Sequence, residues 1–112
     1  MIVETLTRTE NSGKLTYLYK YNLIEGKIFM EFNGGNQSIK SYGIEVERID
    51  ISHGKTVNIK NESIENISPQ KEKVYKLLKM LHQHGVSPIH LVDVIGEYVD
   101  EWVRDFDLIL EN

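Results

Sequence analysis

The spacing of apolar residues changes at Ile67, and this change constrains the fold more than any other feature of the chain. Before it, residues 1–60 alternate apolar and polar side chains, the period of two that is typical of β-strands. After it, apolar residues recur every three or four positions, as they do on one face of a helix. Strands followed by helices predict an α+β fold, in which an antiparallel sheet packs one face against a C-terminal helical hairpin.

The first half of the chain predicts about five strands in a meander. Glycine-containing turns are expected at Glu25-Gly26, at residues 33–36 (NGGN) and at residues 52–54 (SHG). The segments between them read VETLTRT, LTYLYKYNLI, KIFMEFN, SIKSYGIEVERIDI and KTVNIK. In the fourth segment the apolar positions change from even to odd near Glu47-Arg48, which predicts a β-bulge there. In the fifth, Val57 and Ile59 are expected to point toward the core.

Two prolines mark the predicted helix starts. Ser68-Pro69 and Ser87-Pro88 each place an N-capping hydroxyl before a proline at the first helical position. The helices are expected over residues 69–84 and 88–106, and Gly85 supplies a left-handed residue that ends the first. Their apolar faces should be buried; the residues concerned are Val74, Leu77, Leu78 and Leu81, then Val92, Ile95, Val99, Trp102 and Phe106.

Composition limits the domain count and the chemistry. With 112 residues, 40% of them apolar and 27% charged, the chain is expected to form one domain over residues 1–112 without a metal or disulfide. It has no cysteine, which excludes disulfides, thiol nucleophiles and cysteine-ligated metals. It shows neither a signal peptide nor an apolar run of roughly 18 residues. We therefore expect a cytoplasmic protein with no membrane partner.

The segment LLKMLHQHGVSPIHLVDVIGEYVDEW resembles a DNA-binding helix-turn-helix in its spacing. Its second helix carries an acidic exposed face formed by Asp93, Glu97, Asp100 and Glu101. The phosphates of a DNA groove would repel that face, and the net charge of −4 lacks the basic character of a DNA-binding domain. The first helix is basic, with Lys71, Lys73, Lys76 and Lys79. The segment is interpreted as structural, and DNA is not expected as a partner.

No pattern in the chain predicts catalysis or a metal site. Phosphate-binding loops, nucleophile elbows and zinc-protease signatures are missing from the sequence. His82 and His84 are two residues apart and point to different sides, so they do not match a known metal-ligand spacing even with His90 nearby. Glu45 and Glu47 are interpreted as a solvated strand face. We expect no enzyme activity, no cofactor and no metal.

Two functions of different classes remain open. The first is protein–protein interaction, which we favour, through Asp93, Glu97, Asp100 and Glu101 together with the aliphatic C-terminal residues Leu108, Ile109 and Leu110. These three aliphatic residues could fold against the protein's own sheet or join a second copy in a homodimer. The second is binding of RNA or a small ligand on Tyr17, Tyr19 and Tyr21. The alternative for this tyrosine row is a structural role, in which the side chains pack against the helices.

Three segments carry a resemblance to a known family: YGIEVER, ISPQKEKVYKLLKML and GVSPIHLVDVIGEYVDEWV. They resemble an uncharacterised family of small proteins from clostridia and related spore-forming anaerobes, classed as a domain of unknown function. The resemblance covers about the last two-thirds of the chain. It implies a bacterial cytoplasmic setting and transfers no catalytic or binding residue.

Overall fold

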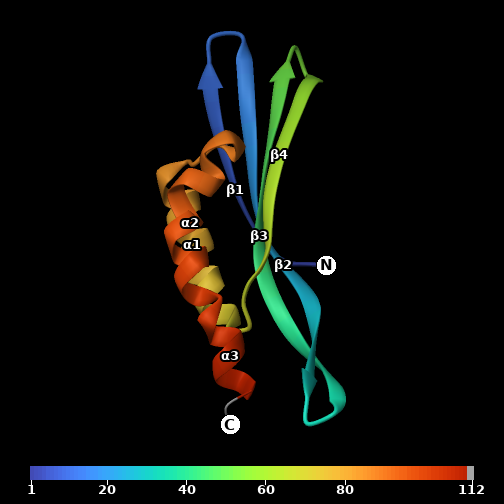
Figure 1. The fold of residues 1–112 in the computed structure, drawn as a ribbon. Helices are drawn as coiled ribbons and strands as arrows, with labels where there is room; N and C mark the ends of the chain where they lie inside the picture. Colours follow the sequence, from blue (N-terminus) through green and yellow to red (C-terminus); the bar gives the residue numbers. More distant parts are fainter. Residues whose placement is uncertain (111–112) are drawn as a thin grey trace.

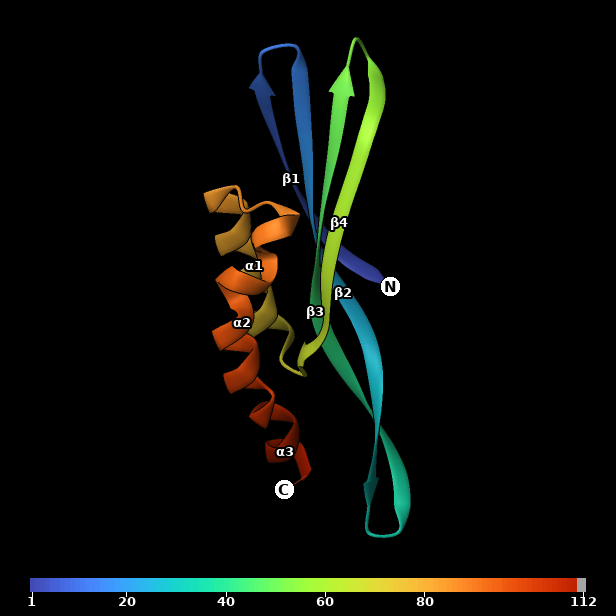
Figure 2. The same cartoon turned by 45° about the horizontal axis from the view of Figure 1, so that its top comes forward.

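Four antiparallel strands form a single meander sheet in the computed structural model, which describes residues 1–110 apart from the side chains of Phe32 and Leu110. The strands are β1 (Ile2–Ser12), β2 (Leu15–Phe32), β3 (Gly35–Ser52) and β4 (Lys55–Ser68). They are followed by α1 (Lys71–His84), a 3-10 turn η1 (Pro88–His90), α2 (Leu91–Trp102) and α3 (Arg104–Leu110). All helices lie on one side of the sheet (Figures 1 and 2). The predicted α+β class and meander are confirmed.

The strand count of five is wrong because β2 runs straight through Glu25-Gly26. Gly26 pairs with Ser41, and the β2–β3 pairing continues without a shift from Leu15 to Phe32. The hairpin turn lies instead at Asn33-Gly34, where φ is 53° and 79°. A two-residue turn that suits strand twist needs positive φ at both positions, which Asn-Gly accepts easily and Glu-Gly does not. The expected turn at residues 33–36 is therefore confirmed.

The predicted bulge near Glu47-Arg48 is also wrong. Arg48 and Asp50 continue the side of β3 that faces the helices, and the Arg48 Nε donates to the Asp50 carboxylate at 2.9 Å. The Arg48 guanidinium lies 5.0 Å from the centre of the Tyr17 ring. A polar pair thus replaces apolar residues on this side, and Ile49 lies on the opposite one. The apolar pattern changes here because polar residues occupy the side of β3 that faces the helices. The pairing of β2 with β3 does not shift.

Irregular pairing occurs instead between β3 and β4. It lies between Tyr42 and Ile44 and again between Asp50 and Ile51. The second irregularity adds an extra residue to β4, near Val57. Val57 and Ile59 are 58% and 56% exposed, so the expectation that they point inward is wrong. Ile59 pairs with Ile49 on the sheet face away from the helices.

The helices bury much of the predicted apolar surface. The buried side chains of α1 are the four predicted ones, and Leu91 and Ile95 are buried in α2. Val92 is 55% exposed, contrary to prediction. The expected continuous helix over residues 88–106 is divided by η1 and by a break at Val103. The predicted Ser68 cap is wrong, because α1 begins at Lys71 with Gln70 as its N-cap residue, and the Ser68 hydroxyl accepts the Gln70 N–H at 3.1 Å just before the helix. Ser87 precedes Pro88 at the start of η1 as predicted, but its hydroxyl makes no capping hydrogen bond.

The C-terminal end of α1 is fastened to the sheet by polar contacts around Gly85. Tyr21 Oη donates to the Val86 carbonyl at 3.0 Å, and Arg8 Nη1 donates to the carbonyls of His82 and Gln83 at 3.2 Å each. Burial raises the pKa of Tyr21, so its hydroxyl stays protonated as a donor. Gly85 has φ 60° and ends the helix in the left-handed conformation.

Gly85→Ala should destabilise the protein more than Gly13→Ala. Both glycines have nearly the same left-handed φ, 60° and 62°, which costs an alanine about 1–2 kcal/mol. A Cβ on Gly85 would also lie 3.0 Å from Arg8 Cζ, whereas nothing lies within 4 Å at Gly13. The additional loss should be about 1 kcal/mol or more. Urea denaturation of both variants measures it, and equal losses would show that the Arg8 contact has no energetic weight.

Candidate functional site

A solvent-open groove separates the outer sides of α1 and α2. It encloses about 430 Å³, within the size range of binding pockets. Its lining comes from both helices and the residue before α1, and consists of Gln70, Glu72, Lys73, Lys76, Leu77, Met80, Tyr98 and Trp102. We call this feature the inter-helix groove.

Helical spacing builds the apolar part of the groove. Leu77 and Met80 are three residues apart on α1, and Tyr98 and Trp102 are four apart on α2, so each pair lies on one helix face. The Tyr98 and Trp102 rings contact each other with centres 5.5 Å apart. Tyr98 is 41% exposed, which is high for a residue of the helical layer. The groove therefore presents an accessible aromatic wall above a buried leucine.

Charge is unequally distributed on the two sides of the groove. The α1 side carries Lys73 and Lys76 together with one carboxylate, Glu72. The next exposed lysine, Lys79, lies 5.2 Å from the Tyr75 ring centre. The α2 side continues into the exposed carboxylates of Glu97 and Glu101. Because both carboxylates are exposed, they remain hydrated and accessible. The outer helical layer thus has a basic half and an acidic half with aromatic residues between them.

A partly buried ion pair between Lys73 and Asp105 lies at one end of the groove. Lys73 Nζ donates to Asp105 Oδ2 at 2.8 Å, and the Ser68 hydroxyl donates to the same oxygen at 2.7 Å. Lys73 also lies 4.7 Å from the Trp102 ring centre. Burial alone would raise the pKa of the Asp105 carboxyl, but the hydrogen bonds from Lys73 and Ser68 hold that pKa below its usual range. This cluster joins β4, α1 and α3.

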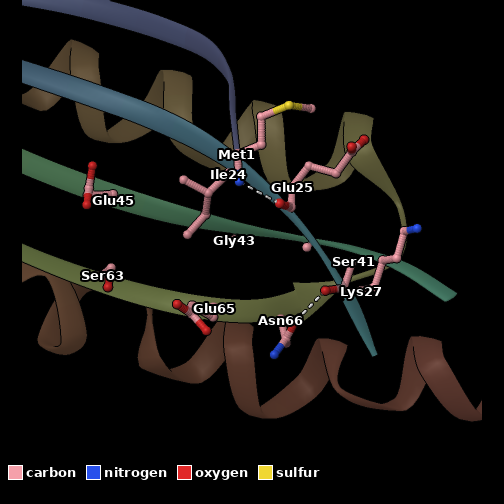
Figure 3. Close-up of a pocket in the computed structure, with 11 residues that line it drawn as sticks. Met1, Ile24, Glu25, Lys27, Ser41, Gly43, Glu45, Ser63, Glu65 and Asn66 are labelled. Atoms are coloured by element: carbon pink, nitrogen blue, oxygen red, sulfur yellow. Dashed lines mark hydrogen bonds between the residues drawn. The ribbon is translucent and has the colours of Figure 1, made fainter. Parts of the chain in front are cut away.

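A second hollow lies on the sheet face away from the helices. Ser41, Gly43 and Glu45 alternate with the buried Tyr42 and Ile44, so they point to the uncovered face. The pocket encloses about 400 Å³ and is lined by Met1, Ile24, Glu25, Gly26, Lys27, Ser41, Gly43, Glu45, Ser63, Glu65 and Asn66. Figure 3 shows Glu45, Ser63 and Glu65 toward one end and Ser41 with Asn66 at the other. We call it the sheet pocket.

Close approach of two strands accounts for the floor of the sheet pocket. A Cβ on Gly43 would lie 2.4 Å from the Ile64 carbonyl oxygen, so only glycine fits there. Several of the polar groups around it already bond within the protein. Ser41 donates to Asn66, Asn22 Nδ2 donates to Glu45 at 2.9 Å, and the Met1 ammonium donates to the Glu25 carbonyl at 2.9 Å. The hollow is a consequence of the irregular β3–β4 pairing.

Metal-ligand side chains do not cluster in either hollow within residues 1–110. No group of three His, Asp or Glu side chains in this part of the chain could share a metal ion. His82 Nε2 lies 2.8 Å from the Thr7 carbonyl oxygen, and His84 and His90 are exposed elsewhere. No buried side-chain nitrogen or oxygen among the described residues lacks a hydrogen-bond partner.

The structure separates the two predicted recognition surfaces. Tyr19 and Tyr21 are buried in the core against the helices, and Tyr17 is half-buried beside Arg48. The tyrosine row is therefore unavailable for stacking on RNA bases, and the packing alternative is correct. The acidic residues Asp93, Glu97, Asp100 and Glu101 are all exposed.

The aliphatic residues Leu108, Ile109 and Leu110 are the last three residues of helix α3. Leu108 and Ile109 are 52% and 42% exposed, while the Leu110 side chain lies outside the described part of the structure. The apolar spacing predicted Trp102 on the buried face of the second helix, and the groove was missed. The exposed Tyr98 beside acidic positions was the available signal.

The fold and the groove define a class: a small α+β protein with one covered sheet face and an accessible helical layer. The chain belongs to a family of unknown function (DUF6514), whose model matches residues 1–101. That match extends over the sheet, α1 and nearly all of α2, and ends before α3. No curated protein and no solved structure matches the chain. No helix in the described part of the chain has the length and apolar character needed to cross a bilayer.

Asp105→Asn should flatten the acid dependence of stability. Because the folded-state pKa of Asp105 is lowered, its ion pair stabilises the protein above the unfolded-state pKa, near about 4, and this is lost as the pH falls through the folded-state value. At pH 7 the variant should lose about 1.5–3 kcal/mol, typical of a hydrogen bond to a charged group.

The measurement is urea denaturation between pH 7 and pH 2. Asp107→Asn is the matched control, since Asp107 is exposed two residues further along the same helix. Its stability should follow the parent protein across the whole range. Identical pH profiles for the two variants would contradict the role given to Asp105.

Proposed function

We propose that the protein is a small non-enzymatic interaction module that binds an acidic amphipathic segment of a polypeptide in the inter-helix groove. One observation carries this proposal: an accessible aromatic wall stands beside the exposed Lys76 in a hollow of about 430 Å³. The cysteine-free composition is compatible with the cytoplasmic setting that belongs to the same proposal.

The residue types of the groove support a protein partner. Tryptophan, tyrosine and methionine are enriched in the cores of protein interfaces, and tyrosine and tryptophan dominate their binding energy. Met80 has an unbranched side chain that adapts to different apolar partners. Tyr98 and Trp102 already contact each other, so binding would order few additional side chains.

The charges of the groove support an acidic partner. Lys76 is exposed at the rim, and Lys79 lies one helical turn beyond it on the same side of α1. Carboxylates on a bound segment would be attracted to this edge, whereas basic segments would be repelled. A nucleic acid is disfavoured because the chain carries a net charge of −4 and lacks the basic character of a nucleic-acid-binding domain. An acidic helix with apolar residues on one face would contact the aromatic wall and the lysine edge of α1 together.

Intrinsic fluorescence tests this proposal, because Trp102 is the only tryptophan in the chain. A synthetic amphipathic peptide with glutamates beside a leucine stripe should shift Trp102 emission to the blue as it covers the ring. The same peptide with lysines in place of the glutamates should bind more weakly. Tyr98→Ala should raise the Kd for the acidic peptide by roughly tenfold or more, as expected for loss of an interface hot spot.

Lys76→Glu should also weaken binding, by placing a carboxylate against the acidic peptide. Lys14→Glu is the control, since Lys14 is exposed in the turn between β1 and β2, which projects beyond the helices (Figure 1). Its peptide affinity should stay close to that of the parent protein. Equal binding of the acidic and basic peptides, or normal binding by both groove variants, would refute the proposed function.

A further inference from the structure

We infer that the acidic amphipathic segment bound in the inter-helix groove is α2 of a second copy, so that two chains associate through their helical layers. This inference rests on the proposed function and names the partner of the same site. It follows from the chemical match between α2 and the segment that the groove would take. The argument has three parts: the ligand character of α2, the symmetry that brings α2 to the groove, and the competing surfaces.

The outer side of α2 has the character of the proposed ligand. Val94 and Tyr98 are 38% and 41% exposed and lie four residues apart on one helix face. Glu97 and Glu101, also four apart, lie beside them and are exposed. The helix therefore offers an apolar pair with a flanking row of carboxylates. This is the arrangement that a groove with an aromatic wall and a lysine rim would bind.

One choice of two-fold axis brings these features together. In Figures 1 and 2, α1 and α2 lie side by side and run in opposite directions. A two-fold axis parallel to the groove places α1 of one copy opposite α2 of the other. Each residue then faces partner residues at the same level along the helix axes. Lys76 lines the groove with Tyr98, so in the dimer it would face the Glu97 and Glu101 region of the partner. An axis across the helices would instead oppose lysines to lysines.

The resulting interface has the anatomy of a stable one. Met80, Tyr98 and Trp102 of both copies meet at its centre, and the lysine and glutamate rows form its rim. Each contact occurs twice, as in any two-fold interface. Charges that are merely segregated on the single chain become paired between chains. The exposed aromatic side chains lose their contact with water in the same step.

Other exposed apolar positions are less suited to a second copy. Val92 and Val103 are 55% and 54% exposed on a different side of α2. The acidic Asp93 and Asp100 lie next to that side, so a two-fold contact there would oppose like charges. Dimerisation through the C-terminal Leu108–Leu110 segment is a distinct possibility that the experiment separates. The charge arrangement favours the groove.

A charge-exchange experiment tests the inference on the full chain. Light scattering and sedimentation should show a concentration-dependent dimer. A variant with Lys76→Glu and Lys79→Glu should be monomeric, because its acidic α1 would face the acidic α2 of a second copy. A variant with Glu97→Lys and Glu101→Lys should be monomeric for the opposite reason. Each should raise the dimer Kd by about tenfold or more.

Mixing the two variants should restore association as a heterodimer, because each α1 then meets an α2 of opposite charge. The control is Lys14→Glu, which should leave the dimer unchanged. Circular dichroism and thermal melting of every variant establish that it is folded. Restored pairing in the mixture also shows folding, since an unfolded variant could not regain a partner.

The remaining outcomes of these experiments distinguish the dimer inference from the proposed peptide-binding function. A monomeric parent protein that binds the acidic peptide would overturn this inference and leave the proposed function intact. A monomer that also ignores the peptide would overturn both. A dimer that survives both charge variants but is lost on truncation after Asp107 would assign association to the C-terminal segment and overturn the inference. If the inference is correct, excess acidic peptide should dissociate the dimer.

Discussion

The packing of α1 and α2 on a single face of the meander is the constraint from which the other features follow. Tyr21, Ile44 and Val46 are fully buried on that face, where Val74, Leu78 and Ile95 cover them. A four-stranded sheet without such cover would expose this whole row to water. Because the helices supply the only apolar layer for these strands within residues 1–110, their inner sides are committed to the sheet. Only their outer sides and the uncovered sheet face remain accessible to other molecules among the described residues.

The sequence could predict the class of the fold because periodicity reports which face of each element is buried. It could not place the turns reliably, since Glu25-Gly26 and Asn33-Gly34 both look like turn dipeptides. The difference lies in the φ values that each first residue accepts, and pairing of β2 with β3 removes the remaining ambiguity. The Arg48–Asp50 pair shows a second limit. Polar residues can occupy the covered face when they satisfy each other, and the apolar pattern then changes without a bulge.

Prediction of the site met a different limit. The basic and acidic helices were visible in the sequence, as were the candidate tyrosines. The inter-helix groove depends on the spacing between two helices that contact the sheet separately, α1 over β2 and β3 and α2 chiefly over β4. No periodicity within one helix specifies that spacing. The contact of Lys73 with both Asp105 and Trp102 fixes one end of it, and this contact joins residues that are about 30 positions apart in the sequence.

The contrast between the two hollows explains why recognition is assigned to the helical layer. In the sheet pocket, Gly43 is required by backbone contact, and Ser41, Glu45 and Asn66 bond to groups of the same chain. Its geometry is therefore explained by folding alone. In the inter-helix groove, folding explains the buried Leu77 and the paired Lys73, but not an exposed Tyr98 beside a row of carboxylates, nor the exposed Lys76 on the opposite helix. Those side chains contribute little to the hydrophobic core of the single chain. They would contribute binding free energy when a complementary surface covers them.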